Sequence, residues 1–362
     1  IGRCCTVSKY WNIIISSTWF HHMRMRMSQK KLMLCYDSYE QGKRLKIMSE
    51  IQVSGDTRRE ERQDVTISGV PTQDPKIIGS SILGIICLVL TQRRNFLGDI
   101  ILVNPTLNKC QNLPAMPNFE RGRLTGKRSN VSYAFWGSTR NGVNDFRVAV
   151  LSMGSYLCFF TTRTWEWLNL DYSPLLGEGN PVDSGAFSNG FLYWFMQFDD
   201  RTKPRILKIN PENSVDNERL ELPVDNVSVA RLDSLNGDLS LICFEIDRIS
   251  LWVREKNQVW RHLINVSPGL DIDDISFWVP EEEDQFWMNA INPRPAIPRY
   301  FPSYCRFIHM ENGHLLLKVG IRIWKKKNSD GLWVKIPGVP FVKDGIVYTP
   351  SVIPPPCHPI LN

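Results

Sequence analysis

The sequence predicts a mainly β protein, in which a short N-terminal helix precedes an antiparallel, kelch-like β-propeller-type domain. Near the N-terminus, apolar residues recur at the spacing of one helical face. From about residue 32 onward, short apolar runs are instead interrupted every several residues by Gly, Pro, Asn or Asp, which is typical of strands and turns. The chain also has 12 Trp, 17 Phe and 10 Tyr, which favour half-buried strands. With 362 residues it can bury a large core.

The N-terminal helix pattern lies within the first twenty residues. Val7, Trp11, Ile14 and Ile15 fall on one face of a helix, and the segment closes at Ser16-Ser17. Periodicity alone also fits an ordinary amphipathic helix that packs on its own domain. The two interpretations differ in whether the apolar face meets a partner protein or the β-domain.

The order of residues in this segment resembles the second half of an F-box, whose usual text reads R-C-x-x-V-S-K-x-W-x-x-L-I-S-S-x-x-F. Matching positions are Arg3, Cys4, Val7, Ser8, Lys9, Trp11, Ile14, Ile15, Ser16, Ser17 and Phe20. The resemblance implies the substrate receptor of an SCF-type ubiquitin ligase, which binds a Skp-family adaptor within a cullin-containing complex. The adaptor-binding residues that it implies are Cys4, Val7, Ser8, Trp11, Ile14 and Ile15.

The usual first helix of an F-box is missing from this sequence, which begins with Ile1. We therefore expect a fragment or a truncated product. A single helix of this length is marginal alone and loses conformational entropy when it is ordered by a partner. The chain as given is expected to bind the adaptor weakly or not at all, and firmly once a leading helix is restored.

Composition limits the cellular compartments and the classes of partner that we expect for the protein. A net charge of +6 from scattered basic residues is a weak case for nucleic acid, and we expect none. Nine Cys without a C-x-x-C pair, several of them in apolar runs such as that of Cys87, indicate reduced thiols. The longest apolar run, residues 77–90, is too short to span a bilayer and predicts a buried strand pair. We expect a cytoplasmic or nuclear protein without a membrane partner.

Two elements repeat along the β region. The first is a Gly turn followed by an apolar strand, at Gly84, Asn189-Gly190, Asn236-Gly237 and Asn312-Gly313. The second is a pair of apolar stretches with a polar turn between them, at residues 100–114, 156–168, 206–223, 249–260 and 321–333. The Gly-to-Gly spacing near 47 fits one four-stranded propeller blade, and the spacing of 106 fits two. The spacing of 76 indicates one blade with long insertions, and the alternative is a β-sandwich with similar hairpins.

The β region also resembles the F-box-associated domain of the large plant family, including the S-locus F-box type. The matching phrases are Val103-Asn104-Pro105-Thr106, Asn112-Leu113-Pro114, Thr164-Trp165-Glu166-Trp167, Asn189-Gly190-Phe191-Leu192-Tyr193-Trp194 and Leu251-Trp252-Val253. The division expected from it is a partial F-box helix and linker at residues 1–31, the β-domain at 32–355 and a tail at 356–362. It implies that the β-domain binds an unknown target protein.

We find no pattern of residues that predicts catalysis. His309 and His314 flank a turn without two further metal ligands, and the acidic clusters at residues 271–274 and 281–284 fit a solvated loop better than a cation site. The sequence therefore predicts no catalytic residue, metal or cofactor. The main alternative to a ligase receptor is a propeller-like interaction module without ligase function, and a propeller enzyme such as a glycosidase is a third class.

Overall fold

The computed structural model describes the strands of the chain and six separate residues that precede them. The described residues are 10, 13–14, 17, 20, 23, 31–40, 43–52, 61–65, 75–80, 83–92, 95–116, 131–140, 143–152, 156–171, 179–197, 203–213, 217–224, 227, 229–235, 237–244, 249–266, 305–309, 315–319, 322–326, 333–335 and 342–348. Strand structure begins at Lys31 and continues to Tyr348.

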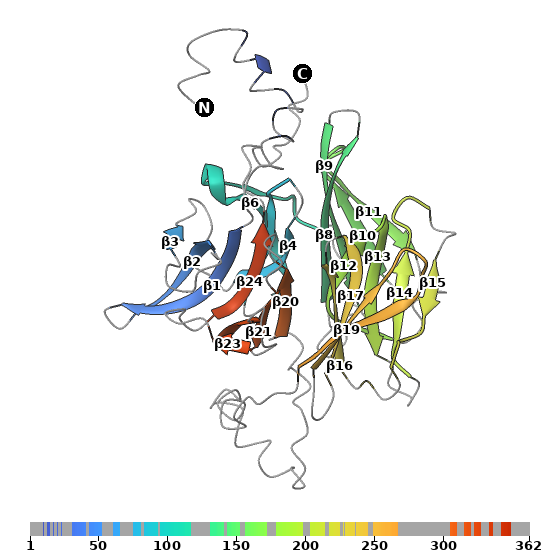
Figure 1. The fold of residues 1–362 in the computed structure, drawn as a ribbon. Coiled ribbons are helices and arrows are strands. Elements are labelled where there is room, and N and C mark those ends of the chain that lie inside the picture. The colour runs from blue at the N-terminus through green and yellow to red at the C-terminus, as the bar shows by residue number, and fades with distance from the viewer. Residues whose placement is uncertain are drawn as a thin grey trace.

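Within the described residues, 24 strands form six four-stranded antiparallel sheets, which we call blades 1 to 6 (Figure 1). Blade 1 contains β24 (Val342–Tyr348), β1 (Lys31–Glu40), β2 (Lys43–Gln52) and β3 (Glu61–Val65). Blade 2 contains β4 (Pro75–Ser80), β5 (Ile86–Gln92), β6 (Asn95–Asn104) and β7 (Lys109–Asn112), with the 3-10 helix η1 (Pro105–Leu107) before β7. Blade 3 contains β8 (Val131–Arg140), β9 (Val143–Ser152), β10 (Tyr156–Thr161) and β11 (Glu166–Asp171).

The remaining three blades repeat this up-and-down order. Blade 4 contains β12 (Asn180–Ser188), β13 (Phe191–Gln197), β14 (Arg205–Ile209) and β15 (Glu218–Leu220). Blade 5 contains β16 (Val229–Leu235), β17 (Asp238–Phe244), β18 (Ile249–Arg254) and β19 (Trp260–Val266). Blade 6 contains β20 (Cys305–His309), β21 (Leu315–Val319), β22 (Arg322–Lys326) and β23 (Trp333–Lys335).

The inner strands of successive blades contact one another from blade 6 through blades 1 to 5, so the sheets are arranged around one axis as a β-propeller. These inner strands contact one another in the order β20, β24, β4, β8, β12 and β16. Blade 1 takes its inner strand, β24, from the C-terminal end of the domain and its other three strands from the N-terminal end, with Lys31 opposite Tyr348. The predicted antiparallel propeller is confirmed, and the β-sandwich alternative is wrong.

Neighbouring inner strands run in the same direction. The early part of β12 meets the early part of β16 through Asp183 and Arg231. At the other end, the Ser188 hydroxyl donates to the Gly237 carbonyl at 2.7 Å. We call the end where the inner strands begin the start face, and the other end the opposite face. Because β1 pairs with the last residues of β24, the chain enters the propeller at the opposite face.

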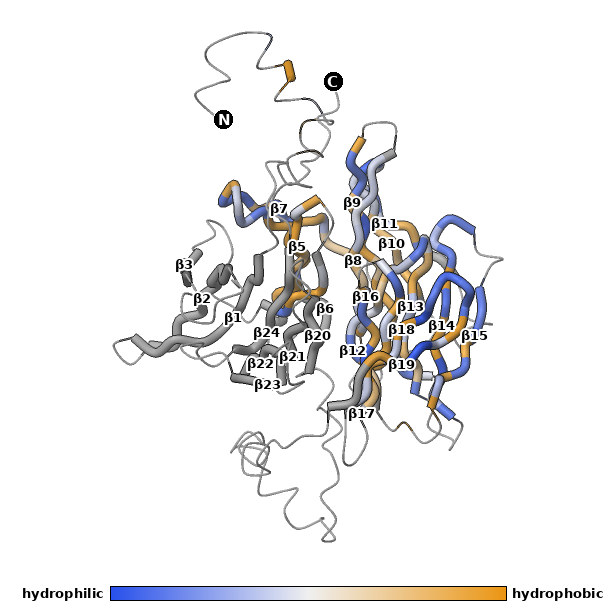
Figure 2. Tube along the Cα trace, in the orientation of Figure 1, coloured by the Kyte–Doolittle hydropathy of each residue, from blue (hydrophilic) through white to orange (hydrophobic). Residues whose placement is uncertain are grey.

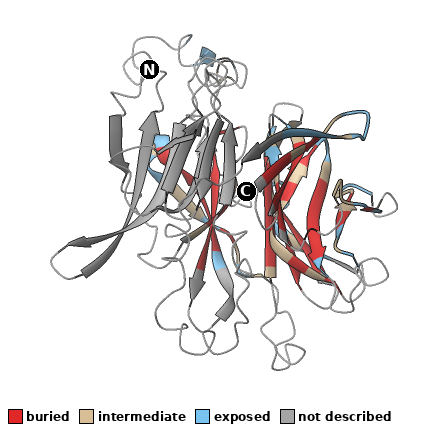
Figure 3. Ribbon diagram, turned by 60° about the horizontal axis from the view of Figure 1, so that its bottom comes forward, coloured by how far each residue is buried: buried red, intermediate tan, exposed pale blue. Residues whose placement is uncertain are grey.

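The blades pack against each other through strands that are apolar on both faces. In blade 4, Tyr193 and Phe195 pack toward blade 5, whereas Leu192 and Trp194 pack toward blade 3. Strand side chains alternate between the two faces of a sheet, so a strand between two neighbours must be apolar at every position. The outer strand β15 is instead largely hydrophilic (Figure 2), and buried residues run along the middle of the blades (Figure 3).

The predicted turns at Gly84, Gly190 and Gly237 join the first and second strands of blades 2, 4 and 5, and Asn312-Gly313 lies outside the described residues. Asn189 and Gly190 have φ angles of 49° and 86°, which is the left-handed pair that a type I′ turn requires, and Gly84 and Gly237 also have positive φ. The interval of 106 residues does contain two blades. The sequence interpretation passed over Asn141-Gly142, which joins β8 to β9 in the blade between them.

One expectation is not shown by the structure, and one is confirmed. Five of the six described residues before Lys31 have helical conformation, but they are not consecutive enough to define a helix with bounds, so the helical F-box remnant is not shown. The apolar run 77–90 does form the buried strand pair β4 and β5.

The described cysteine side chains form no disulfide with one another, and most of them are buried. Cys87, Cys158 and Cys243 are buried, and Cys110 is half-buried. Burial raises the pKa of the Cys158 thiol to about 11 and that of Cys87 above the range of ordinary thiols. Both thiols therefore remain protonated at neutral pH, as expected for cysteines that act as small core residues.

Candidate functional site

The described N-terminal residues expose a set of large apolar side chains. Tyr10, Ile13, Ile14 and Met23 are all exposed and have helical conformation. Ser17 interrupts them: its hydroxyl donates to the Ile14 carbonyl at 2.6 Å and accepts the Phe20 N–H at 3.3 Å. A serine in this position caps the turn that follows it.

Of the six predicted adaptor-binding residues, only Ile14 is described, and it is 44% exposed. The other five lie outside the described residues, namely Cys4, Val7, Ser8, Trp11 and Ile15. The structure therefore does not test whether the six lie together, and their role remains a prediction.

A cluster of charged residues lies near the axis, close to the start face. Asp183 on β12 pairs with Arg231 on β16 at 3.2 Å and with Lys76 on β4 at 3.3 Å. The Asp183 and Arg231 side chains are almost fully buried, whereas that of Lys76 is 40% exposed. Three inner strands from separate blades are thus joined by one carboxylate.

A local irregularity in β12 accompanies this position of Asp183. The pairing register of β12 with β13 shifts between Val182 and Ala186, and Asp183 has a φ of 60°. Bulges of this kind redirect a side chain out of the regular alternation, and Asp tolerates positive φ better than most residues. The Ser132 hydroxyl on β8 donates to the Asp183 carbonyl and accepts the Trp194 indole N–H, which adds a fourth inner strand to the cluster.

The cluster keeps Asp183 ionised. Burial alone would raise the pKa of its carboxyl group, but the charges of Arg231 and Lys76, with hydrogen bonds from Ser184 and Lys76, lower the pKa to about 2. Two cations face one carboxylate, so the described side chains of the cluster carry a net charge of about +1 at neutral pH. Of the two cations, Lys76 is the one exposed to solvent.

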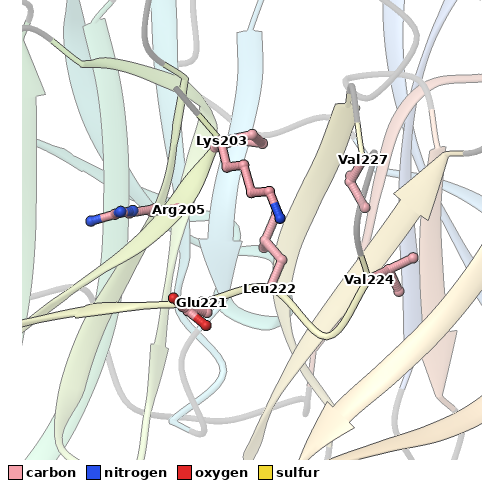
Figure 4. A pocket seen from close by; sticks show the side chains of 7 residues that line it. Lys203, Arg205, Glu221, Leu222, Val224 and Val227 are labelled. Carbon is pink, nitrogen blue, oxygen red and sulfur yellow. The ribbon is translucent and has the colours of Figure 1, made fainter. Parts of the chain in front are cut away.

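A pocket of about 100 Å³ lies on the start face, where blade 4 leads into blade 5 (Figure 4). Its lining residues come from the segment before and at the start of β14 and from the link between β15 and β16: Lys203, Pro204, Arg205, Glu221, Leu222, Val224 and Val227. Val227 is buried, and Leu222 and Val224 pack with it on the core between the two blades. The pocket therefore borders the apolar core, but three of its seven lining residues, Lys203, Arg205 and Glu221, are charged.

Sequence reasoning did not find either of these start-face features. Asp183 and Arg231 are 48 positions apart, and each looks like a surface residue in its own segment. The one available signal was Asp183-Ser184-Gly185 inside an otherwise apolar stretch, because a charge and a Gly within a strand often mark a bulge.

The described residues show neither a cluster of metal ligands nor a membrane-spanning helix. No group of three or more His, Cys, Asp or Glu side chains within this part of the chain is arranged to hold a metal ion. Likewise, none of the helical residues that are described belongs to a helix long and apolar enough to span a membrane. His314 and the acidic clusters at 271–274 and 281–284 lie outside the described residues.

No protein-family model and no curated protein sequence matches the chain. Among solved structures, the chain is similar to a fucose-specific lectin from Aleuria aurantia, at 13% identity and a TM-score of 0.41 over 90% of this chain and 99% of the lectin. It is also similar to a functionally unknown protein from Desulfotomaculum acetoxidans DSM 771, at 11% identity and a TM-score of 0.46 over 84% and 83% of the two chains. A third is apo AztD from Citrobacter koseri, at 10% identity and a TM-score of 0.34 over 86% and 74%. None of the three carries an argument about what this chain binds.

Proposed function

We propose that this chain is the substrate receptor of an SCF-type E3 ubiquitin ligase. In this role the N-terminal segment binds a Skp-family adaptor and the propeller binds a target protein. A β-propeller is consistent with a protein-interaction module, because its sheets, arranged around one axis, hold loops rigidly at both ends. The ligase role itself comes from the F-box resemblance of residues 3–20.

The observation that carries the proposal is the separation of the two ends of the propeller. The pairing of Lys31 with Tyr348 places the beginning of β1 at the opposite face. The ion cluster and the pocket belong to the start face, at the beginnings of the inner strands and of β14. A receptor needs this arrangement, since adaptor and target must bind without excluding each other.

Exposed apolar residues of the N-terminal segment support the same role. Tyr10 and Ile13 are 80% and 59% exposed, and Ile14 is 44% exposed. Several such side chains close together in sequence are typical of a protein-binding surface. An apolar helical face that enters a groove of a partner is one of the common modes of peptide recognition.

A pull-down against a panel of Skp-family adaptors tests the proposal. Two versions are compared, the chain as given and a version with a leading F-box helix added, each with and without Ile14→Asp. We expect the extended version to bind at least one adaptor and Ile14→Asp to reduce that binding at least tenfold. The control is Val259→Asp, which adds the same charge at an exposed aliphatic residue of blade 5 and should leave binding unchanged.

The outcomes separate the two functions considered. Loss of adaptor binding with Ile14→Asp but not with Val259→Asp supports the receptor. No binding by either version would overturn the ligase role and leave a propeller that acts as a protein-interaction module without ligase function.

A further inference from the structure

The turn that joins β12 to β13 presents an Asn-Gly pair to solvent. Asn189 and Gly190 are both exposed, and they have φ angles of 49° and 86°. The flanking residues Ser188 and Phe191 pair with each other, so the turn contains only these two residues. A Cβ atom added to Gly190 would meet no atom within 4 Å other than those of its chain neighbours. The backbone of the turn therefore has open space around it.

An asparagine that precedes a glycine loses its side-chain amide without an enzyme. The backbone nitrogen of Gly190 forms a bond to Cγ of Asn189, and the amide group leaves as ammonia with the proton of that nitrogen. Water then opens the resulting succinimide ring at either of its two carbonyl carbons, which gives aspartate or isoaspartate at position 189. Glycine favours the first step because it has no Cβ that crowds the attacking nitrogen.

The exposure of the turn permits the backbone rotation that this first step requires. With positive φ at both positions, the turn holds the Gly190 nitrogen away from the Asn189 side chain, so the reaction takes place when the turn opens locally. Among the described residues, no hydrogen bond holds the Asn189 side chain in place. Opening of the turn therefore breaks no contact of this side chain within the described part of the chain.

Asn108 provides a matched comparison within the same chain. It is exposed and has a φ of 51°, so its backbone occupies the same left-handed region as that of Asn189. It is followed by Lys109, whose Cβ crowds the backbone nitrogen that would have to attack. A faster reaction at Asn189 than at Asn108 would thus come from the residue that follows, and not from exposure or φ.

A change in this turn also affects the contact between blades 4 and 5. The Ser188 hydroxyl donates to the Gly237 carbonyl of the neighbouring turn at 2.7 Å. Isoaspartate adds one methylene group to the backbone of a two-residue turn, which changes how Ser188 and Phe191 pair. Ordinary aspartate adds no backbone atom, and Asp-Gly suits the same type I′ turn. The isoaspartate product, and not the aspartate product, therefore weakens the hydrogen bond between the blades.

We propose that Asn189 is a site of spontaneous deamidation, and that its isoaspartate product weakens the contact between blades 4 and 5 at the opposite face. Water is the only co-reactant. The reaction involves neither an adaptor nor a target protein, so it goes beyond the proposed ligase role and does not depend on it.

The first test is incubation of the full chain at 37 °C and pH 8.5, followed by mass spectrometry of its peptides. Deamidation raises the mass of a peptide by about 1 Da, and methylation by a protein L-isoaspartyl methyltransferase identifies isoaspartate. We expect Asn189 to react about tenfold faster than Asn108, and more slowly at pH 6, because the attacking nitrogen must lose its proton. Conversion of Asn189 no faster than that of Asn108, or without isoaspartate, would overturn the proposal.

The second test measures the contact between the blades by hydrogen exchange and mass spectrometry. Asn189→Gly keeps a pair that suits the turn but has no amide to lose, and freshly prepared Asn189→Asp carries the carboxylate without the extra methylene group. After incubation, the turns before β13 and β17 should exchange about fivefold faster in wild type, as for the loss of one hydrogen bond, but not in Asn189→Gly. Fresh Asn189→Asp should match fresh wild type. Equal exchange in incubated wild type and incubated Asn189→Gly would overturn the weakened contact.

Discussion

Replacement of Asp183 by Asn is expected to destabilise the propeller and to change how its stability depends on pH. Asp183 is the common partner of Arg231 and Lys76, and only 3% of its side chain is exposed. Asn keeps the shape of the side chain but removes its charge. Arg231 would then remain buried without the anion that compensates it.

The lowered pKa sets the size of the effect. A folded-state pKa of about 2 against the ordinary 3.8 corresponds to about 2.4 kcal/mol, at about 1.36 kcal/mol per pH unit. Because the folded pKa is lowered, this stabilisation is fully present above pH 4 and is lost as the pH falls from about 4 to about 2. Roughly half of it should be left at pH 3, where the unfolded chain is mostly protonated and the folded chain mostly ionised.

The assay is urea unfolding of wild type and Asp183→Asn at pH 7 and at pH 3, monitored by tryptophan fluorescence. We expect Asp183→Asn to lower the free energy of unfolding by about 2–4 kcal/mol at pH 7, and by clearly less at pH 3. Asp238→Asn, at a half-buried residue of β17, is the control for loss of one carboxylate and should change stability little. A deficit that is absent at pH 7, or that has the same size at both pH values, would refute the reasoning.

Two further predictions concern the core. Gly185→Ala should lower the free energy of unfolding by about 1–3 kcal/mol, because its new Cβ would lie 2.5 Å from the indole nitrogen of the buried Trp194. Gly79→Ala is the control, because its Cβ would meet Phe135 at an ordinary 3.5 Å. It should change stability by less than about 1 kcal/mol in the same urea assay. The Cys87 thiol, whose pKa is raised by burial, should react with a thiol reagent only at the rate of global unfolding, as measured by mass spectrometry of labelled peptides; rapid labelling of the folded chain would contradict its position in the core.

For the N-terminal segment, the sequence supports a hypothesis that the structure does not test. The F-box resemblance of residues 3–20 rests on residue identities at fixed positions, and those are present in the sequence whether or not the segment is packed. Only six residues before Lys31 are described, and Ile14 alone of the predicted adaptor-binding set is among them. The assignment of these residues therefore depends on the binding experiment and not on the fold.

The sequence by itself determined the local units of the propeller. Asn189-Gly190 and Gly84 mark turns that need positive φ, and alternating apolar stretches mark hairpins, because both signals lie within a few neighbouring residues. The interval between turns then gave the four-stranded blade. These signals depend only on residues close together in the sequence, so they can be recognised without knowing which hairpins pack against each other.

Only the tertiary structure decided how blade 1 is assembled from both ends of the domain and where the start-face features lie. The pairing of β24 with β1 joins residues from the two ends of the domain and removes two open sheet edges, but neither strand carries a signal for its partner. The same holds for Asp183, Arg231 and Lys76, which are unremarkable charged residues in three separate segments. Their contact, their burial and the lowered pKa of Asp183 follow from the convergence of inner strands on one axis.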